Sequence, residues 1–284
     1  MSSPEAPPTA PAAPRPLLRL EQLGLLGVIV LLALLLSMLA GSHQDPETGR
    51  TVNNFLNPNT LLQTATDASF FAIMAVGATM VIISGGIDLS VGSVVALTTV
   101  VIAWLLQHAG WPDGWAALAG IGAGAVCGLL TGALITRLQV VPFIVTLGMM
   151  LMIRGLAKAL AHSQKIDAPL GWLKDLTASL PPERQFMLLP PGVWLVIALG
   201  LILASALRTM RYGRHVFAIG SNELTARLCG VAVERTKLLT YTLGGAFFGL
   251  AGLMLFSRLT VGDPTAAQGL ELDVIAAVVI GGGS

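Results

Sequence analysis

Long apolar stretches, separated by short polar segments, are the main feature of the chain. Stretches long enough to cross the hydrocarbon core of a bilayer recur at about residues 23–41, 61–84, 89–108, 115–136, 190–208 and 238–257. A shorter stretch from Val140 to Ile153 runs into the basic residues Arg154 and Lys158, and we expect it to be a seventh crossing or a broken, partly re-entrant helix. An eighth apolar stretch opens at Val274. The pattern predicts an all-α, polytopic membrane protein with about seven to eight transmembrane helices.

The first 16 residues have a different character from the rest. They contain six prolines and several alanines with almost no periodic apolar pattern, so we expect residues 1–16 to be a disordered tail. Residues 17–284 are expected to form one membrane domain. Its first apolar stretch is long enough to span a bilayer and lacks a clear small-residue cleavage site, so we interpret it as a retained helix rather than a secretory signal.

Composition supports a membrane location and argues against a nucleic acid partner. Hydrophobic residues make up 54% of the chain and charged residues 11%, and the mean hydropathy is +0.79. That is too little charge to cover the surface of a soluble globule of this length. The net charge of +1 argues against a nucleic acid partner. Cys127 lies in an apolar stretch and Cys229 in a polar one, so we expect no disulfide and no metal site from them.

The distribution of basic residues predicts the orientation. The segment 208–237 carries six basic residues against two acidic ones, Glu223 and Glu234. Because short cytoplasmic loops carry the excess of lysine and arginine, we place a loop at about 208–238 in the cytoplasm. If every stretch crosses once, the N-terminus is cytoplasmic too, in agreement with Arg15 and Arg19 before the first helix and Arg137 after the fourth.

A carboxylate in a glycine-rich break follows the second apolar stretch. Residues 85–93 read Gly-Gly-Ile-Asp-Leu-Ser-Val-Gly-Ser. Gly85 and Gly86 let the backbone turn or let another element approach it closely. Asp88 is an ionisable residue close to membrane depth, where such residues are usually paired, hydrated or functional. It either has a functional role or caps the next helix; for Ser90, a cap or a back-bond to a carbonyl is the stronger interpretation.

Glycines also recur at helical spacing inside two apolar stretches. Such glycines let membrane helices pack closely, because no side chain separates the two backbones. We therefore expect close helix packing at Gly120, Gly122, Gly124, Gly128, Gly244, Gly245, Gly249 and Gly252.

The polar loop contains a pattern typical of one short, capped helix. Ser221 or Asn222 can serve as the N-cap, Glu223 falls in the first turn, where the helix dipole favours a negative charge, and Gly230 can take the left-handed position after the end. Leu224 and Leu228, four residues apart, would share one apolar face. Such a helix suits docking into a cleft of another protein, or it lies on the lipid headgroups.

Two more carboxylates, Glu271 and Asp273, precede the last apolar stretch. They could hydrogen-bond to hydroxyl groups of a substrate, pair with a basic residue such as Arg154, or cap a helix, and capping is the favoured interpretation. The chain contains no phosphate-binding loop, and its terminal Gly-Gly-Gly-Ser lacks the lysine, so ATP hydrolysis would need another chain. Motifs of hydrolases and metalloproteases are also missing, and the sequence offers no enzyme site.

Four blocks of the sequence, in order, resemble the permease subunits of ribose-type ABC sugar importers. They are residues 85–93, 141–157, 212–237 and 269–284, and the resemblance covers residues 61–284. Members of that family continue with further apolar helices, whereas this sequence ends inside one, so we expect it to be truncated or incomplete. Asp67 also departs from the family, whose members usually carry an apolar residue there.

The resemblance implies a transport subunit of the bacterial inner membrane rather than an enzyme. The functional unit would contain two permease subunits, two ATPase subunits that bind ATP and Mg²⁺, and a periplasmic binding protein that delivers a monosaccharide, a pentose or a hexose. The permease would hold no cofactor and no metal. Residues of the translocation path would be Gly85, Gly86, Asp88, Ser90, Glu271 and Asp273. The helix that contacts the ATPase would comprise Asn222, Glu223, Leu224, Ala226, Leu228 and Gly230, with Ala226 and Gly230 in an Ala-x-x-x-Gly element.

Two alternative functions stay open. One is an ABC permease of the same architecture for branched-chain amino acids or nucleosides. The other is an ion-coupled secondary transporter, which also needs glycine breaks and intramembrane carboxylates. Only Asp67 and Asp88 would be plausible proton or sodium sites in that case, and neither has an evident partner in the sequence.

Overall fold

The computed structural model describes residues 20–44, 51–169, 171–178 and 189–283. The tail predicted at residues 1–16 lies outside them. The chain divides into two compact units, one up to Leu61 and one from Leu62 onward. The first unit holds helix α1 (Leu20–Leu39) and an antiparallel pair of short strands, β1 (Ser42–Gln44) and β2 (Thr51–Asn53). The Asn53 side chain donates to the Ser37 carbonyl at 2.7 Å and fastens the strand pair to the end of α1.

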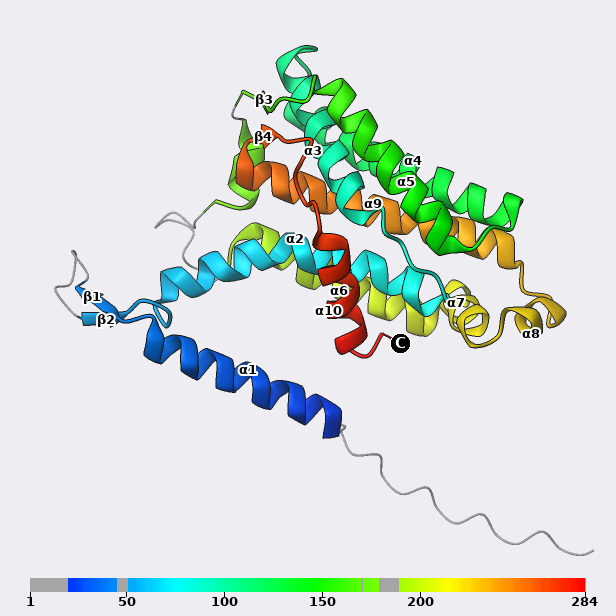
Figure 1. Cartoon of the computed structure of the whole chain (residues 1–284), viewed down its shortest axis with the longest axis horizontal. Coiled ribbons are helices and arrows are strands. Elements are labelled where there is room, and N and C mark those ends of the chain that lie inside the picture. Colours follow the sequence, from blue (N-terminus) through cyan, green and yellow to red (C-terminus); the bar gives the residue numbers. More distant parts are fainter. Residues whose placement is uncertain (1–19, 45–50, 170, 179–188, 284) are drawn as a thin grey trace, which may run out of the picture. The chain divides into compact units, whose positions relative to one another are not determined.

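The second unit is built from helices (Figure 1). Helix α2 (Pro58–Ile83) leads into it from the junction between the units. The remaining elements follow in the order α3 (Val91–Gln107), α4 (Asp113–Leu138), α5 (Pro142–Leu160), β3 (Ile166–Asp167), the 3-10 helix η1 (Trp172–Leu176), α6 (Pro191–Thr209), α7 (Arg211–Ser221), α8 (Glu223–Leu228), α9 (Val233–Leu259), β4 (Val261–Gly262) and α10 (Leu270–Ile280). Strands β3 and β4 pair antiparallel over two residues each.

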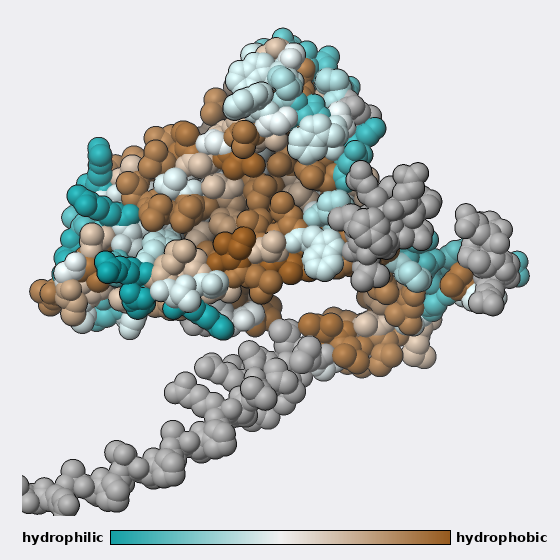
Figure 2. Space-filling model, turned by 180° about the vertical axis from the view of Figure 1, so that it is seen from behind, coloured by the Kyte–Doolittle hydropathy of each residue, from teal (hydrophilic) through white to brown (hydrophobic). Residues whose placement is uncertain are grey.

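The helices confirm the predicted all-α, polytopic architecture. Among the described residues, α2, α4, α5, α6 and α9 are long and apolar enough to cross a membrane, and α3 and residues 27–39 form shorter apolar helices. The stretch from Val140 to Ile153 therefore belongs to a helix of spanning length. The stretch predicted at 89–108 is a helix of 17 residues, shorter than the roughly 20 that a bilayer needs. Figure 2 shows apolar side chains spread across one face of the second unit, with hydrophilic ones gathered at its edges.

Helices α4 and α9 approach each other through glycines, as predicted. A Cβ atom on Gly124 would lie 2.5 Å from the Gly245 carbonyl oxygen, and one on Gly245 would lie 2.3 Å from the Gly124 carbonyl oxygen. Gly122 is the exception, because its Cβ would meet nothing within 4 Å. Around this contact, α2, α3 and α9 bury apolar side chains such as Ile73 and Phe248, both fully inaccessible to solvent. Close backbone packing therefore holds the centre of the unit together.

The predicted loop at 208–238 contains two helices rather than one. Helix α8 matches the predicted capped helix, but α7 was missed. Gly213 and Gly220 lower the intrinsic helix propensity of α7. Tertiary packing overrides that penalty, because a Cβ on Gly213 would lie 2.0 Å from the Leu207 carbonyl oxygen and one on Gly220 would lie 1.8 Å from the Ile83 carbonyl oxygen.

A test of this packing compares two glycines of α4. Gly128→Ala would place a Cβ 2.1 Å from the Tyr241 carbonyl oxygen, whereas Gly122→Ala adds a methyl group in open space. Because the α9 backbone cannot move aside cheaply, we expect Gly128→Ala to cost about 1–3 kcal/mol of stability or more. Gly122→Ala should be neutral. Thermal unfolding of both variants in detergent measures the difference, and equal midpoints would contradict the packing.

Candidate translocation site and coupling helix

The glycine-rich break begins where α2 ends. Gly85 has a φ of +79°, which glycine adopts without strain, and its N–H donates to the Ile82 carbonyl at 2.9 Å. The Gly86 N–H donates to the Val81 carbonyl at 3.0 Å. A Cβ on Gly86 would lie 2.4 Å from the Tyr241 hydroxyl oxygen on α9. The two glycines therefore serve different needs, since the first permits the turn and the second permits the close approach of α9.

Asp88 closes the turn that leads into α3. Its side chain is buried, with 4% of its surface exposed, and its Oδ1 accepts hydrogen bonds from the Ser90 backbone N–H at 2.8 Å and from the Ser90 hydroxyl at 2.6 Å. Ser90 is the N-cap residue of α3, but its side chain makes no cap hydrogen bond and donates to Asp88 instead. Both residues lie in the break as predicted, and the contacts they make support the turn.

A second break follows α9. It starts at Thr260, which has a φ of +58°, runs through β4 and ends at Gly269, the N-cap of α10. Arg154 of α5 holds this segment, because one of its guanidinium nitrogens donates to the carbonyl oxygens of Pro264 at 3.1 Å and Ala266 at 2.7 Å. Arg154 therefore satisfies backbone acceptors, and none of the described ion pairs joins it to Glu271 or Asp273.

Asp263 fixes the start of the second break. Its backbone N–H donates to the Thr99 hydroxyl of α3 at 3.2 Å, and its carboxylate accepts from Thr265 at 2.6 Å and pairs with Lys165 at 3.0 Å. The carboxylate therefore ties β4 to the β3 segment.

The two breaks meet at Gly92, in the first turn of α3. A Cβ on Gly92 would lie 2.3 Å from the Ala267 carbonyl oxygen and 2.9 Å from Oε2 of Glu271. That Oε2 and the hydroxyl of the neighbouring Ser93 are both buried, and neither has a hydrogen-bond partner among the described residues. Asp273 is exposed. The structure thus brings Glu271 to the glycine-rich break and leaves Asp273 on the surface of α10.

The arrangement at Gly92 suits the binding of hydroxyl groups. A buried carboxylate oxygen or hydroxyl without a partner costs about 1–3 kcal/mol relative to a satisfied one. Non-helical backbone at membrane depth is tolerated only where it is enclosed by protein or lines a cavity, and broken helices of this kind line the substrate sites of transporters. The Glu271 carboxylate can accept hydrogen bonds and the Ser93 hydroxyl can accept and donate them, and no described residue uses the buried Glu271 Oε2 or the Ser93 hydroxyl.

Helix α8 has the predicted caps. The Asn222 side-chain oxygen accepts from the Thr225 N–H at 2.9 Å, so Asn222 rather than Ser221 is the N-cap, and Gly230 has a φ of +82°. Leu224 and Leu228 are 68% and 80% exposed. Ala226, on the other side of the helix, is buried. An exposed pair of leucines on a capped helix is a surface that a partner protein can bind.

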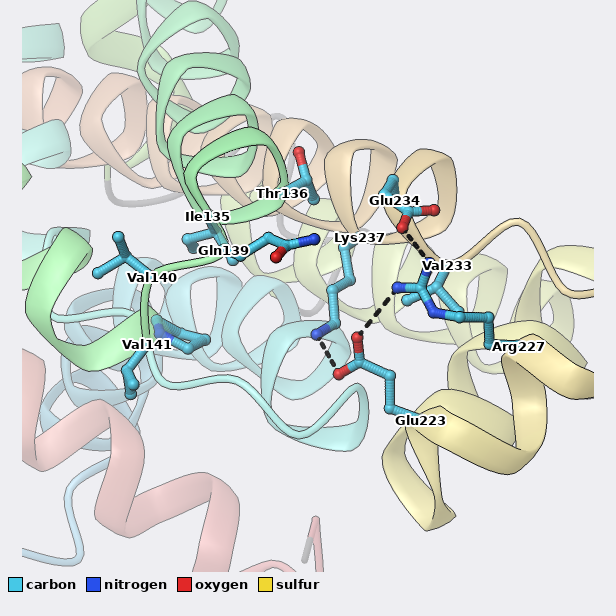
Figure 3. A pocket seen from close by; sticks show the side chains of 11 residues that line it. Ile135, Thr136, Gln139, Val140, Val141, Glu223, Arg227, Val233, Glu234 and Lys237 are labelled. Carbon is cyan, nitrogen blue, oxygen red and sulfur yellow. Dashed lines mark hydrogen bonds and ion pairs between the residues drawn. The ribbon is translucent and has the colours of Figure 1, made fainter.

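A cavity of about 270 Å³ lies beside α8 (Figure 3). The connection between α4 and α5 forms one wall, and α8 and the first turns of α9 form the other. Glu223 pairs with Lys237 at 2.6 Å and with Arg227 at 3.7 Å, and Arg227 also pairs with Glu234. These four charges cancel, so the cavity wall has no net charge to attract an anion. The ion pairs tie α8 to α9.

Asp67 has a partner that the sequence did not reveal. Its carboxylate takes two contacts from the Arg258 guanidinium, with Nε to Oδ1 at 2.7 Å and Nη2 to Oδ2 at 3.3 Å. The sequence made no partner evident for Asp67 or Asp88, and the structure gives Arg258 to the first and Ser90 to the second. Cys127 and Cys229 are free thiols, as expected. No group of three or more histidine, cysteine, aspartate or glutamate side chains that could hold a metal ion occurs among the described residues.

Apolar helices of spanning length, interrupted by broken segments, are typical of membrane transport proteins. Comparison with known families agrees, because residues 60–284 match the family described as the permease component of the branched-chain amino acid transport system. The chain belongs to this permease family and is a multi-pass membrane protein. It is a transport subunit rather than an enzyme.

Several curated relatives place the chain more closely within the family. It is 38% identical to the ribose import permease protein of Escherichia coli strain K12, over 81% of this chain and 71% of the relative. It is 35% identical to the ribose import permease protein of Bacillus subtilis strain 168, over 81% and 70%. It is 32% identical to the fructose import permease protein of Rhizobium meliloti, over 80% and 64%. No solved structure matches the chain. The predicted resemblance to ribose-type permeases is confirmed.

Gly92 and Ser93 were not selected as site residues from the sequence, although they lie in the glycine-rich motif. They are distinguished by their position in the first turn of α3, directly after a turn in which the Asp88 and Ser90 side chains hydrogen-bond to each other. Tyr241 gave no signal at all, because an aromatic residue in an apolar helix is ordinarily part of the core.

A pair of variants tests the contact at Gly86. Gly86→Ala would place its methyl group 2.4 Å from the Tyr241 hydroxyl oxygen, and we expect a lower thermal midpoint by the equivalent of about 1–3 kcal/mol. Tyr241→Phe removes a buried hydroxyl that has no partner and should be neutral or stabilising. In the double variant the atoms nearest to the added Cβ are Val81 Cγ1 at 3.2 Å and the ring of residue 241 at 3.3 Å. Most of the lost stability should therefore be recovered. Additive effects would contradict the contact.

Proposed function

We propose that the chain is the membrane-spanning subunit of an ATP-driven importer that translocates a monosaccharide, a pentose or a hexose. The observation that carries the proposal is the 38% identity, over 81% of the chain, to a protein named as a ribose import permease. The junction at Gly92 supports it, because Glu271 and Ser93 offer buried hydrogen-bonding groups without partners, which suit a solute rich in hydroxyl groups.

The energy comes from a separate ATPase subunit, which binds ATP and Mg²⁺. The chain contains no phosphate-binding loop, and the exposed leucines of α8 offer a contact surface for that partner. The complete importer contains a second permease subunit and a periplasmic protein that delivers the sugar. The basic charge of the segment 208–237 supports a cytoplasmic position for α7 and α8 and a cytoplasmic N-terminus. The membrane is then the bacterial inner membrane.

Transport proceeds by alternating access. ATP binding closes the ATPase subunits, and α8 moves with the ATPase surface on which it sits. The two breaks then separate at Gly92, so that the hydrogen-bonding groups of Glu271 and Ser93 become accessible to the sugar. Hydrolysis reverses the movement and releases the sugar into the cytoplasm. Of the residues predicted to line the path, Gly85, Gly86, Asp88 and Ser90 shape the turn, and Glu271 is the one aimed at the junction.

The alternative functions have less support. The family description names branched-chain amino acids, but the relatives with the identities given above are named for ribose and fructose. An ion-coupled transporter needs a carboxylate free to exchange protons or sodium. Both carboxylate oxygens of Asp67 contact the Arg258 guanidinium, and the Asp88 carboxylate accepts a hydrogen bond from the Ser90 hydroxyl.

The role of Glu271 can be tested against its neighbour in the same turn. Glu271→Gln should lower uptake of radiolabelled ribose and fructose about tenfold, because the amide presents a donor where the carboxylate presented only acceptors. Asp273→Asn, on the exposed side of α10, should transport normally. Both variants should reach the membrane in equal amounts by immunoblot. Equal uptake by the two variants would remove Glu271 from the path.

The partner surface on α8 can be tested with two substitutions of one leucine. Leu228 is 80% exposed, so Leu228→Asp should leave the fold intact but place a charge in the contact with the ATPase. We expect the tagged variant to lose copurification of the ATPase and to lose ATP-driven uptake. Leu228→Ile, which stays apolar, should retain both. Copurification that survives Leu228→Asp would show that the ATPase binds elsewhere.

A further inference from the structure

Helix α7 contacts the start of the glycine-rich break directly. A Cβ on Gly220 would lie 1.8 Å from the carbonyl oxygen of Ile83, the last residue of α2. In the other direction, a Cβ on Gly85 would lie 3.9 Å from the Gly220 Cα atom. Backbone therefore meets backbone at this point, with no side chain between them that could deform. Figure 1 shows α7 beside the end of α2 from which the chain turns toward α3.

Helix α7 is also joined firmly to the coupling helix. Ile219 of α7, Ala226 of α8 and Val233 of α9 form one buried apolar cluster, with 3%, 4% and 1% of their surfaces exposed. Asn222 is both the C-cap of α7 and the N-cap of α8, so no flexible linker separates the two helices. A displacement of α8 is therefore transmitted to Gly220, since densely packed cores move as units.

On the α2 side of the contact with Gly220, the chain leaves regular helical structure. The last hydrogen bonds of α2 run from the N–H groups of Ser84, Gly85 and Gly86, at 3.2, 2.9 and 3.0 Å from their acceptors. Beyond Gly86 the chain runs through the Asp88 turn to Gly92, where it meets Ala267 and Glu271. A displacement of the Ile83 carbonyl therefore acts on a segment that few regular backbone hydrogen bonds stabilise.

We propose that Gly220 is a positioning residue that transmits the movement of α8 to the glycine-rich break and so opens the junction at Gly92. This inference rests on the proposed function, because it requires an ATPase that moves α8. Gly220 touches no substrate; it acts through Ile83 and the segment that follows. A larger residue would hold α7 away from α2 and would separate ATP hydrolysis from transport.

The test measures transport and ATP hydrolysis in the same samples. The complex of the chain with its ATPase is reconstituted into proteoliposomes with the binding protein, and radiolabelled ribose taken up is divided by ATP hydrolysed. For Gly220→Ala we expect this ratio to fall about tenfold or more while hydrolysis continues. Gly122→Ala, a helical glycine whose Cβ would meet nothing within 4 Å, should leave the ratio unchanged. If Gly220 were only a packing residue, hydrolysis and uptake would fall together, and that result would overturn the proposal.

A second measurement covers the case in which Gly220→Ala fails to assemble. Amide hydrogen exchange of the unaltered complex is compared with and without a non-hydrolysable ATP analogue. We expect exchange at Ser84, Gly85 and Gly86 to change on nucleotide binding, because these amides directly follow Ile83, which Gly220 contacts. The amides around Gly122 should not respond. Unchanged exchange at residues 84–86 would overturn the proposal. Failure of the unaltered complex to take up any sugar of a labelled panel of pentoses and hexoses would contradict the proposed function instead, and it is visible before any variant is made.

Discussion

Lipid offers no hydrogen bonds, and this constraint governs where the chain can leave a helix within the membrane. Each of the two breaks, one from residue 84 into the first turn of α3 and one at residues 260–269, leaves backbone groups that a continuous helix would have satisfied. The protein supplies the missing partners itself. Thr99 and Arg154 bind the backbone of the second break, and Asp88 binds the Ser90 N–H of the first. The rest of the unit packs around these contacts, and within it α4 and α9 approach each other closely at their glycines.

This construction explains how one element serves both packing and transport. The breaks are held by a few polar contacts and by close backbone approach rather than by a continuous ladder of helical hydrogen bonds. Segments held in this way generally open at a lower free-energy cost than densely packed helices such as α4 and α9. Glu271 approaches Gly92 where the breaks touch, and Ser93 is the next residue of α3. Each has a buried polar atom that no described residue binds.

The sequence predicted local structure well and distant contacts poorly. Hydropathy located α4 to within two residues at each end. Gly230 and two candidates for the N-cap, Ser221 and Asn222, were recognised because capping depends on neighbouring residues, and the structure selects Asn222. Helix α7 was missed because its glycines argue against a helix and only tertiary packing justifies them. The pairing of Asp67 with Arg258 joins residues 191 positions apart, and no local pattern reports such a contact. The meeting of Gly92 with Glu271 was hidden for the same reason.

Accessibility of Ser93 during transport tests the central claim that the junction at Gly92 opens. Ser93 has 1% of its surface exposed, so a cysteine there should be unreactive at rest. In a chain whose two native cysteines are replaced, Ser93→Cys should react with a water-soluble thiol reagent when ATP and the binding protein drive turnover, and excess ribose should slow the reaction. Thr98→Cys, buried against Gly120 of α4, should stay unreactive throughout. A Ser93→Cys chain that transports ribose yet never reacts would contradict the account.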